Sequence, residues 1–400
     1  MLSATARPLI AASVPVLREH GEAITRCFYQ RMFSAHPELH DLFNLGNQAS
    51  GAQQQALAGA VYAYAANIDN RDALQPVLAR IAHKHASIGI TPAQYTIVGK
   101  HLLAAIAEVL DQAATPELLA AWDEAYWLLA VELIAQEARL YQQADHRPGQ
   151  WRTMRVVRKQ QEGELVASFY LQPADGGHLP DFLPGQYVSV ALDVHSVQRR
   201  QIRQYSLSDL PGQDCWRISV KREGGVVAGM VSNLLHDQVV EGDVLLVSPP
   251  FGEFVLAPDN HAPLVLLSAG VGVTPMVSMM KHARRRQPQR PIVFAHAARN
   301  GRHHALRHEL LAAGADSSLS TTVFYEFPEA NDRPGEDYDY SGRMRLDLLQ
   351  QDRLVPDADY YLCGPLPFMR EQRRALLDRG IDPLRIRYEV FGPDLFQGYN

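Results

Sequence analysis

The hydrophobic pattern of this chain changes its period once, near residue 150, and this change constrains the fold more than any other feature. Before it, apolar residues recur every three or four positions, which is typical of helices. After it, short apolar segments are separated by Gly, Pro and Asp, which is typical of strands. The polar segment 142–151 contains Pro148-Gly149 and predicts a linker. A fold with only one kind of element is therefore excluded.

Length and composition set the remaining bounds. The 400 residues suit two or three domains, and 46% hydrophobic with 20% charged residues predicts ordinary folded cores. A net charge of -6 argues against a nucleic-acid partner. The scattered Cys27, Cys215 and Cys363 form neither a zinc cluster nor a disulfide framework, and they fit a reducing cytoplasm. No apolar segment is long enough for stable membrane insertion, and we interpret 8–17, interrupted by Pro15, as helix rather than signal peptide.

Residues 1–146 predict successive helices. The expected helical segments are 8–30, 24–33, 53–64, 77–88, 92–99 and 116–142, with breaks at Pro37, Gly46, Gly51, Pro76, Pro92 and Pro116. Helical spacing puts on one face Val77, Ile81, His85 and Ile88. A lone histidine in an apolar stripe is more often a hydrogen-bonded core residue than a metal ligand. Tyr29 and Gln53 likewise enter apolar faces, and each alone is better interpreted as reaching the surface.

Taken together, these residues and five short motifs resemble the haem domain of the flavohaemoglobin family. The motifs are CFYQRMF at 27–33, HPEL at 36–39, LFN at 42–44, AHKH at 82–85 and QEA at 136–138. The resemblance implies a haem site formed by Tyr29, Phe43, Gln53, Leu57, Lys84 and His85. His85 would be the proximal iron ligand, which leaves the sixth iron position open for dioxygen.

The other roles follow from the same resemblance. Phe43 would pack on the porphyrin, and distal Tyr29 and Gln53 would donate hydrogen bonds to bound oxygen. The family also pairs the ligand with a glutamate and a tyrosine, here Glu137 and Tyr95, which makes the imidazole more electron-rich. The alternative for Glu137 is a solvated helix face.

Trp127 departs from the family, which has a small residue at this position of the last helix. If the Trp127 side chain points inward, it reshapes the haem pocket; if it points outward, the pocket is unaffected.

The middle of the chain predicts a small antiparallel β-barrel. The expected strands are 153–159, 165–172, 186–192, 203–208, 216–221 and 244–248. Gly224-Gly225 and Gly229 precede a short helix at 231–236, whose free N–H groups can accept phosphate oxygens.

These segments resemble the flavin domain of the ferredoxin–NADP reductase family. The resemblance implies FAD, although spacing alone leaves FMN open, and a flavin site formed by Tyr187, Arg203, Gln204, Tyr205, Ser206 and Ser232. Tyr205 would pack on the isoalloxazine and Ser206 would hydrogen-bond near its reactive nitrogen. Arg203 would neutralise the pyrophosphate, and Tyr187 would lie on the adenylate side.

The last part predicts a doubly wound α/β domain. Its expected strands are 264–268, 292–297, 320–325, 359–362 and 385–389, and its expected helices begin at Met276, His303 and Leu366. After the first strand comes a turn typical of the reductase family, Gly270, Val271, Gly272, Val273, Thr274 and Pro275. A glycine turn between a strand and a helix can hold a pyrophosphate.

Two further segments match the reductase family. Cys363, Gly364 and Pro365 would lie beside the nicotinamide, although a buried structural cysteine is the alternative for Cys363. The closing motif, whose aromatic residue covers the flavin, is Val390, Phe391, Gly392 and Pro393. Arg299 could meet a 2′-phosphate, but the choice between NADH and NADPH stays open.

The predicted protein is thus multidomain: an all-α globin (1–146), an antiparallel β-barrel flavin domain (147–261) and a doubly wound α/β nicotinamide domain (262–400). The flavohaemoglobin resemblance implies a nitric oxide dioxygenase that uses haem b, FAD and NAD(P)H. The expected protein is a cytoplasmic monomer that acts on nitric oxide and dioxygen and can hold a lipid in the haem pocket. The alternatives are a hydroperoxide reductase or NAD(P)H oxidase, an oxygen-storage or sensing globin, and a flavin reductase with a haem-free helical domain.

Overall fold

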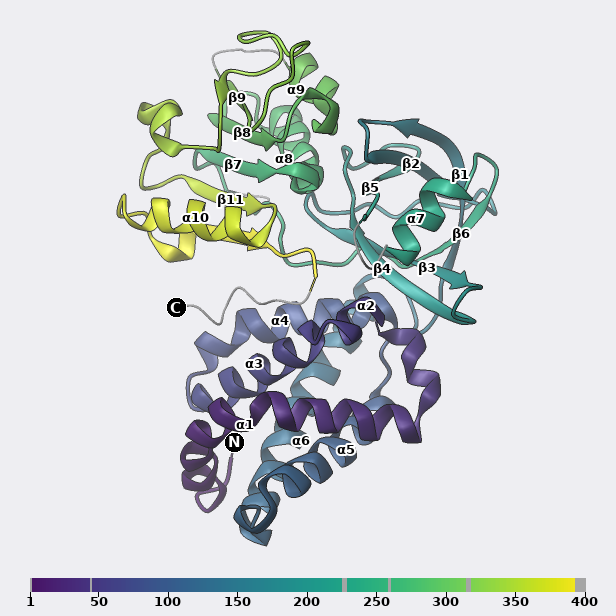
Figure 1. Ribbon diagram of the computed structural model, residues 1–400, viewed down its shortest axis with the longest axis vertical. Coiled ribbons are helices and arrows are strands. Elements are labelled where there is room, and N and C mark those ends of the chain that lie inside the picture. Colours follow the sequence, from purple (N-terminus) through teal and green to yellow (C-terminus); the bar gives the residue numbers. More distant parts are fainter. Residues whose placement is uncertain (1, 44, 225–228, 258–259, 314–317, 393–400) are drawn as a thin grey trace. The chain divides into compact units, whose positions relative to one another are not determined.

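The computed structural model describes residues 2–43, 45–224, 229–257, 260–313 and 318–392 (Figure 1). The chain divides into two compact units, a mainly helical one (residues up to 151, with 191–203) and a reductase-like one (152–190 and 204–391). The helices are described first and the two sheets after them. None of the helices within the described ranges is long and apolar enough to cross a bilayer.

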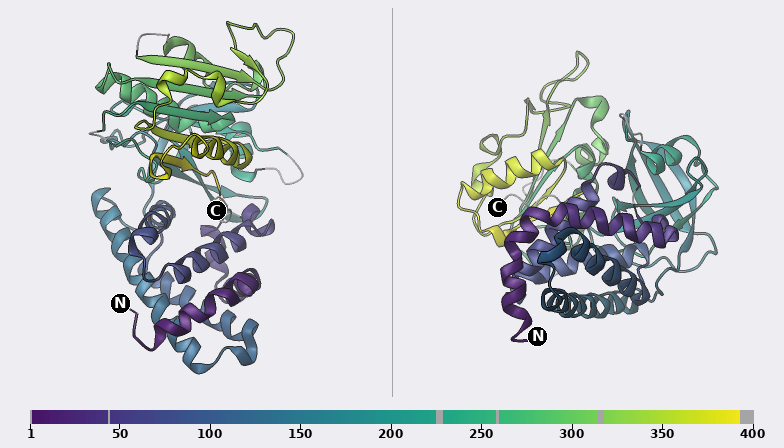
Figure 2. Two further views of the ribbon diagram at one scale, coloured as in Figure 1. Left: turned by 90° about the vertical axis from the view of Figure 1, so that its left-hand side faces the viewer. Right: turned by 60° about the horizontal axis from the view of Figure 1, so that its bottom comes forward.

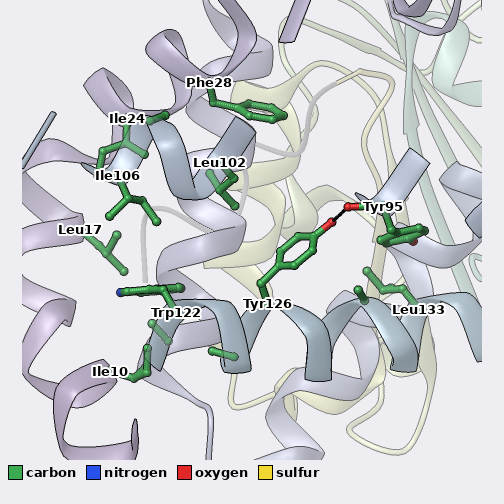
Figure 3. Packing of buried hydrophobic residues seen from close by; sticks show 14 of the residues in the cluster. Ile10, Leu17, Ile24, Phe28, Tyr95, Leu102, Ile106, Trp122, Tyr126 and Leu133 are labelled. Atoms are coloured by element: carbon green, nitrogen blue, oxygen red, sulfur yellow. Dashed lines mark hydrogen bonds between the residues drawn. The ribbon is translucent and has the colours of Figure 1, made fainter. Parts of the chain in front are cut away.

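The helical unit is formed by six α-helices and short 3-10 turns, and it confirms the predicted all-α character. The elements are α1 (Ala6–Ala35), η1 (Pro37–Leu42), α2 (Leu45–Ala49), α3 (Ala52–Ala66), α4 (Arg71–Ile88), α5 (Pro92–Leu110), η2 (Asp111–Ala113) and α6 (Pro116–Gln143). Buried residues of α1 and α3 to α6 form one core, part of which is drawn in Figure 3.

Local capping explains where the helices begin and end. Asn70 caps α4 by accepting a hydrogen bond from the Ala73 amide, and Gly89 ends α4 with a positive φ of 83°. A capping box between Thr91 and Gln94 starts α5, as the Thr-Pro pair predicts. The α4–α5 corner, which carries His85 on one side and Tyr95 on the other, is therefore set by local sequence.

Two predicted helix breaks are wrong. Pro76 lies inside α4, where it removes a single intrahelical hydrogen bond while the neighbouring Leu74 and Leu78 remain buried in the core. Gly46 lies inside the short helix α2. The predicted N-terminal helix is confirmed, and α1 continues through Pro15 as well.

The first part of the reductase-like unit is the predicted antiparallel barrel. It consists of β1 (Arg152–Gln161), β2 (Val166–Pro173), β3 (Tyr187–Val194), β4 (Arg199–Ser206), β5 (Trp216–Lys221) and β6 (Val244–Val247), with α7 (Met230–Asp237). The sheet order is β4-β3-β6-β1-β2-β5, and a bridge from Leu207 to Ile218 joins its two edges. The curvature of this sheet can be followed in the right-hand view of Figure 2.

The second part is a parallel sheet with the order β10-β9-β8-β7-β11-β12. Its elements are β7 (Leu264–Ala269), α8 (Val273–Arg286), β8 (Ile292–Ala298), α9 (Arg307–Ala313), β9 (Leu319–Tyr325), β10 (Tyr340–Ser341), β11 (Asp359–Cys363), α10 (Leu366–Leu377) and β12 (Ile386–Glu389). The chain runs outward from β7 toward β10 and then returns to β11 on the other side. Because parallel crossovers are right-handed, this reversal puts helices on both faces and confirms the doubly wound class.

Several boundaries in this unit differ from the prediction. The helix expected from Met276 begins at Val273. The helix expected from His303 begins at Arg307, because residues 301–303 form a 3-10 turn and Leu306 has a φ of 55°, which no α-helix allows. The strand expected at 203–208 is β4, which begins at Arg199 and ends at Ser206.

A buried polar chain crosses the nicotinamide-type domain. Ser268 and His296 Nδ1 are 2.9 Å apart, His296 stacks on His304 at 4.8 Å, and His304 Nδ1 lies 3.0 Å from the Tyr325 hydroxyl. Burial lowers the pKa of His296 to about 3. Burial, with His296 and Arg307, holds the pKa of His304 well below its usual value. Both imidazoles are therefore neutral in the folded protein.

This pair predicts a loss of stability in acid. In the unfolded chain each histidine takes a proton near pH 6.5, whereas in the fold it does not. Stability is thus complete well above pH 6.5 and falls as the pH drops toward 3, by about 2 kcal/mol for His296 at pH 5, and His304 adds a loss of the same sign. Hydrogen exchange of the β8 and β9 amides at pH 5 and pH 7 would measure this loss. His296→Leu should weaken the pH dependence, whereas the same change at exposed His195 should leave it intact.

Candidate functional site

Three helices of the helical unit bring together His85, Tyr95 and Glu137. His85 Nδ1 lies 2.8 Å from Glu137 Oε1 and 2.9 Å from the Tyr95 hydroxyl, which itself donates to the same carboxylate oxygen. Glu137 is 2% exposed, so its interpretation as a solvated residue is wrong. Burial, followed by the carboxylate of Glu137, raises the pKa of Tyr95 and keeps its hydroxyl protonated.

This geometry fixes the tautomer of His85. A carboxylate accepts hydrogen bonds and donates none, so the ring proton of His85 lies on Nδ1. The lone pair of Nε2 is then available to a metal ion, and the carboxylate increases its basicity. His85 is half-buried on α4, whereas the buried face of that helix carries Leu74, Leu78, Ala82 and Ala86. A purely structural core histidine does not match this arrangement.

Two further tyrosines of α6 hold the same corner, and sequence reasoning gave them no role. The Tyr126 hydroxyl donates to the backbone carbonyl of Tyr95 (Figure 3), and the Tyr141 hydroxyl donates to the carbonyl of Ile90 at 2.9 Å. The Tyr126 ring also occupies the space that a side chain at Gly99 would need. Tyr126 lies 11 residues before Glu137 and Tyr141 lies 4 residues after it, so all three share one helix face. This spacing is the sequence signal that could have identified the two tyrosines.

On the opposite part of the core, Tyr29 lies in an aromatic cluster. Its ring centroid is 4.8 Å from Phe28 and 5.7 Å from both Phe33 and Phe43. Tyr29 is 4% exposed, and burial raises its pKa although Gln53 hydrogen-bonds to its phenol. The hydroxyl therefore stays protonated and can act as a hydrogen-bond donor. Tyr29 thus lies beside both Gln53 and Phe43.

The other residues predicted for this domain are placed as follows. Leu57 is half-buried on α3, and Lys84 is exposed on α4 beside His85. Trp127 is 38% exposed and meets Tyr126 edge-on at 5.5 Å. The Trp127 side chain thus points outward, which is the alternative that leaves the haem pocket unaffected. Asn44 of the LFN motif lies outside the described residues.

In the barrel, alternation along β4 separates the predicted flavin residues into two sets. Arg203 and Tyr205 share one half-buried face, so a guanidinium and an aromatic ring lie side by side. On the other face Ser206 is buried, and the Gln204 amide donates to Ser189 at 3.3 Å. Tyr187 is buried on β3.

Ser232 lies in the first turn of α7. Its hydroxyl accepts from the amide of Glu223 at 3.3 Å and donates to the carbonyl of Gly229 at 3.2 Å. These bonds fix the start of the helix. Gly225, part of the glycine-rich turn, lies outside the described residues.

At the point where the order of the parallel sheet reverses, two predicted turns meet. A side chain at Gly272 would collide with the backbone of Cys363 and Gly364, so only glycine allows this approach. Gly270 has a φ of 56°. Val271 completes the turn, Val273, Thr274 and Pro275 begin α8, and Pro365 is the N-cap residue of α10. Such a reversal is where open α/β sheets bind their ligands.

The remaining predicted residues lie near this point. Cys363 is fully buried, and its burial together with Glu389 raises the pKa of its thiol well above the usual value. Val390 is half-buried and Phe391 is 47% exposed, next to Gly392, whose φ is 137°. Pro393 lies outside the described residues.

The fold and these sites define a class of protein, a globin joined to a reductase of the flavin and nicotinamide type. Two family profiles agree: "Globin" matches residues 26–133 and "Oxidoreductase NAD-binding domain" matches residues 266–374. A flavohemoprotein from Bordetella parapertussis is 55% identical over 397 residues, covering 98% of this chain and 99% of the relative. One from Bacillus subtilis is 45% identical, covering 97% and 96%. The chain belongs to the flavohemoprotein family.

Solved structures support this membership. The flavohemoglobin of Malassezia yamatoensis, determined with bound FAD and heme, has a TM-score of 0.86 and 32% identity, covering 98% of this chain and all of that one. The flavohem-like FAD/NAD binding domain of nitric oxide dioxygenase from Vibrio cholerae has a TM-score of 0.54 and 38% identity. That domain covers 60% of this chain, and the match extends over 99% of its own length.

Proposed function

We propose that this chain is a nitric oxide dioxygenase that converts nitric oxide and dioxygen to nitrate with electrons from NAD(P)H. The observation that carries the proposal is the hydrogen-bonded triad of His85, Tyr95 and Glu137 in a globin domain joined to a reductase. An oxygen-storage globin needs no continuous supply of electrons, so the attached reductase favours catalysis.

The residues present fit the three cofactors. His85 offers Nε2 to a haem iron, because Nδ1 is engaged by Glu137. Arg203 and Tyr205 offer a cation and a ring to FAD, and the turn at Gly270–Gly272 opens the 14-residue helix α8 toward a dinucleotide phosphate. When bound, these groups supply the redox chemistry: nicotinamide gives a hydride, flavin divides its two electrons, and haem iron binds dioxygen.

The side chains of this protein orient and polarise the reactants. Glu137 holds the imidazole of His85 in one tautomer and increases its electron donation. Tyr29 keeps its proton, so its hydroxyl can donate a hydrogen bond to negative charge that develops on oxygen. Gln53 is hydrogen-bonded to that phenol and limits its orientation.

The test is the stoichiometry of the reaction. Purified protein loaded with haem and FAD should consume two molecules of nitric oxide for each NADH and release two of nitrate, since one hydride carries two electrons. Nitrate is measured by ion chromatography and nitric oxide with an electrode. If NADH is oxidised at the same rate without nitric oxide and peroxide accumulates, the protein is an oxidase instead.

We further propose a monomer in the cytoplasm. Each chain carries its own set of the three sites, and its three cysteines are all unpaired, as suits a reducing compartment. A lipid in the haem pocket stays a prediction.

A further inference from the structure

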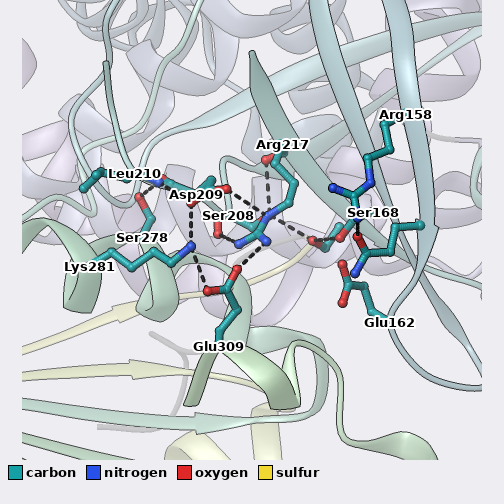
Figure 4. Close-up of polar contacts among 12 residues, drawn as sticks. Arg158, Glu162, Ser168, Ser208, Asp209, Leu210, Arg217, Ser278, Lys281 and Glu309 are labelled. Atoms are coloured by element: carbon teal, nitrogen blue, oxygen red, sulfur yellow. Dashed lines mark hydrogen bonds and ion pairs between the residues drawn. The ribbon is translucent and has the colours of Figure 1, made fainter. Parts of the chain in front are cut away.

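Four charged side chains meet where the barrel packs against the nicotinamide-type domain (Figure 4). We call them the charge quartet: Arg217 on β5 and Asp209 after β4 come from the barrel, while Lys281 on α8 and Glu309 on α9 come from the other domain. Arg217 Nη1 donates to Glu309 Oε1 at 2.5 Å. Lys281 Nζ lies 2.7 Å from Asp209 Oδ1 and 2.7 Å from Glu309 Oε2.

The quartet is electrically balanced, and its Arg217–Glu309 half is buried. The Arg217 side chain is 2% exposed and that of Glu309 is 11% exposed, whereas those of Asp209 and Lys281 are 23% and 27% exposed. Burial opposes ionisation of Asp209 and Glu309, but Arg217 and Lys281 more than offset it and hold both pKa values below their usual range. Both carboxyl groups are therefore ionised. Removing one of them would leave an uncompensated charge in a poorly solvated place.

Hydrogen bonds to hydroxyl and backbone carbonyl groups extend the quartet on both sides. Ser278 of α8 donates to the backbone carbonyl of Asp209 at 2.7 Å. Arg217 also donates through Nε to the Ser208 hydroxyl at 3.1 Å, and through Nη2 to the Ser208 carbonyl. The segment 208–209 is thus held from the barrel side and from α8 at once.

Two of the segments that the quartet joins adjoin or carry predicted cofactor residues. Asp209 follows Ser206, at the end of the flavin strand β4, by three residues. Lys281 and Ser278 lie on α8, whose first residues belong to the predicted dinucleotide turn. A displacement of α8 against the segment after β4 would therefore change the separation of the nicotinamide and the flavin.

We propose that the charge quartet is a positioning device for hydride transfer. It rests on the proposed function, because it presumes that NAD(P)H reduces FAD in this unit. In that step a hydrogen leaves the nicotinamide ring with its electron pair and bonds to the flavin, so the nicotinamide is oxidised and the flavin reduced. Such steps are steeply sensitive to geometry, and a misplacement of about 1 Å can cost 100-fold in rate.

The test uses Lys281→Gln, Glu309→Gln and the double variant, in holoenzyme containing haem and FAD. Each single change leaves one unbalanced buried charge, whereas the double change restores neutrality. We expect each single variant to slow flavin reduction by NADH about tenfold in stopped-flow, with normal FAD content and normal reduction by dithionite. The double variant should lose less than the product of the two single losses, since the residues are coupled.

A structural measurement accompanies the kinetics. Amide hydrogen exchange in β5 and α9 should rise in both single variants, because the contacts between these elements are loosened. The matched control is Glu164→Gln, which removes an exposed ion pair with Arg302 at the same boundary; its partners are 42% and 63% exposed. Flavin reduction and exchange should stay within twofold of the wild type in this control.

The outcomes separate this proposal from the function itself. If both single variants reduce flavin within twofold of the wild-type rate, or if Glu164→Gln slows it equally, the quartet does not position the cofactors. Flavin reduction can be followed with ferricyanide as the acceptor, which needs neither haem nor nitric oxide. A wild-type protein that reduces ferricyanide but consumes no nitric oxide would overturn the proposed function. The role of the quartet would then still be decided by the flavin-reduction rates of the variants.

Discussion

His85→Ala is expected to yield protein that retains its flavin absorbance, lacks the haem Soret band and consumes nitric oxide at the rate of buffer alone. The reason is the hydrogen-bond arrangement around the imidazole: Glu137 and Tyr95 both engage the Nδ1 side, so the Nε2 side is the one directed to a metal. Losing an outer partner of a metal ligand typically costs 10–100-fold, and losing the ligand itself should exceed about a hundredfold. Absorbance spectra and a nitric oxide electrode provide the measurement.

The matched control for this variant is His83→Ala. His83 lies on α4 two residues before His85, so it points to a different face, and its loss should leave the Soret band unchanged. A second variant, His85→Gly, opens space for free imidazole, and adding imidazole should restore haem absorbance. Normal haem in His85→Ala would mean that another residue binds the iron.

Tyr29→Phe is the second large effect. Burial raises the pKa of Tyr29, so the phenol is a permanent donor, and phenylalanine removes that donor while keeping the ring contacts with Phe28 and Phe43. Loss of one well-placed donor to developing negative charge typically costs 10²–10³-fold in rate. We expect nitric oxide consumption to fall by about that factor, with haem content and flavin reduction by NADH unchanged.

Tyr64→Phe is the control for removing a buried phenol. Tyr64 lies on α3, the helix of Gln53, and its hydroxyl donates to the carbonyl of Ala125 at 3.1 Å. Removing it should cost about 1 kcal/mol of stability and little activity. If Tyr64→Phe and Tyr29→Phe slow the reaction equally, the effect of Tyr29 comes from packing, and its assignment as a donor fails.

Much of the fold could be predicted from local patterns. Helical spacing predicted α3, α4 and α6, and the Thr-Pro pair before residue 93 predicted the start of α5, because capping and periodicity depend on residues only a few positions apart. The wrong boundaries arose where packing or backbone geometry overrides a local rule. Pro76 is accommodated inside α4, and Leu306, with its positive φ, delays the start of α9.

The candidate haem site likewise has features that the sequence predicts and features that depend on packing. Tyr29, Gln53, His85, Tyr95 and Glu137 were named from motifs that resemble a known family. The burial of Glu137, by contrast, could not be inferred from its own helix, because α4 and α5 supply the side chains that cover it. Trp127 is the residue next to the buried Tyr126, yet its side chain points outward. Its own helix does not tell which of the two the neighbouring helices cover.

The sequence by itself determined the order of the three parts and the type of nearly every element, because both depend on short-range spacing. The residues proposed to bear the chemistry were named by resemblance of their motifs to a known family. Only the tertiary structure decided which nitrogen of His85 is available, that Tyr126 and Tyr141 support its corner, and that Arg217 meets Glu309. The physical reason is the separation along the chain. Tyr95 and Glu137 are 42 residues apart, and Arg217 and Glu309 are 92 apart, so only the packed chain brings these partners into contact.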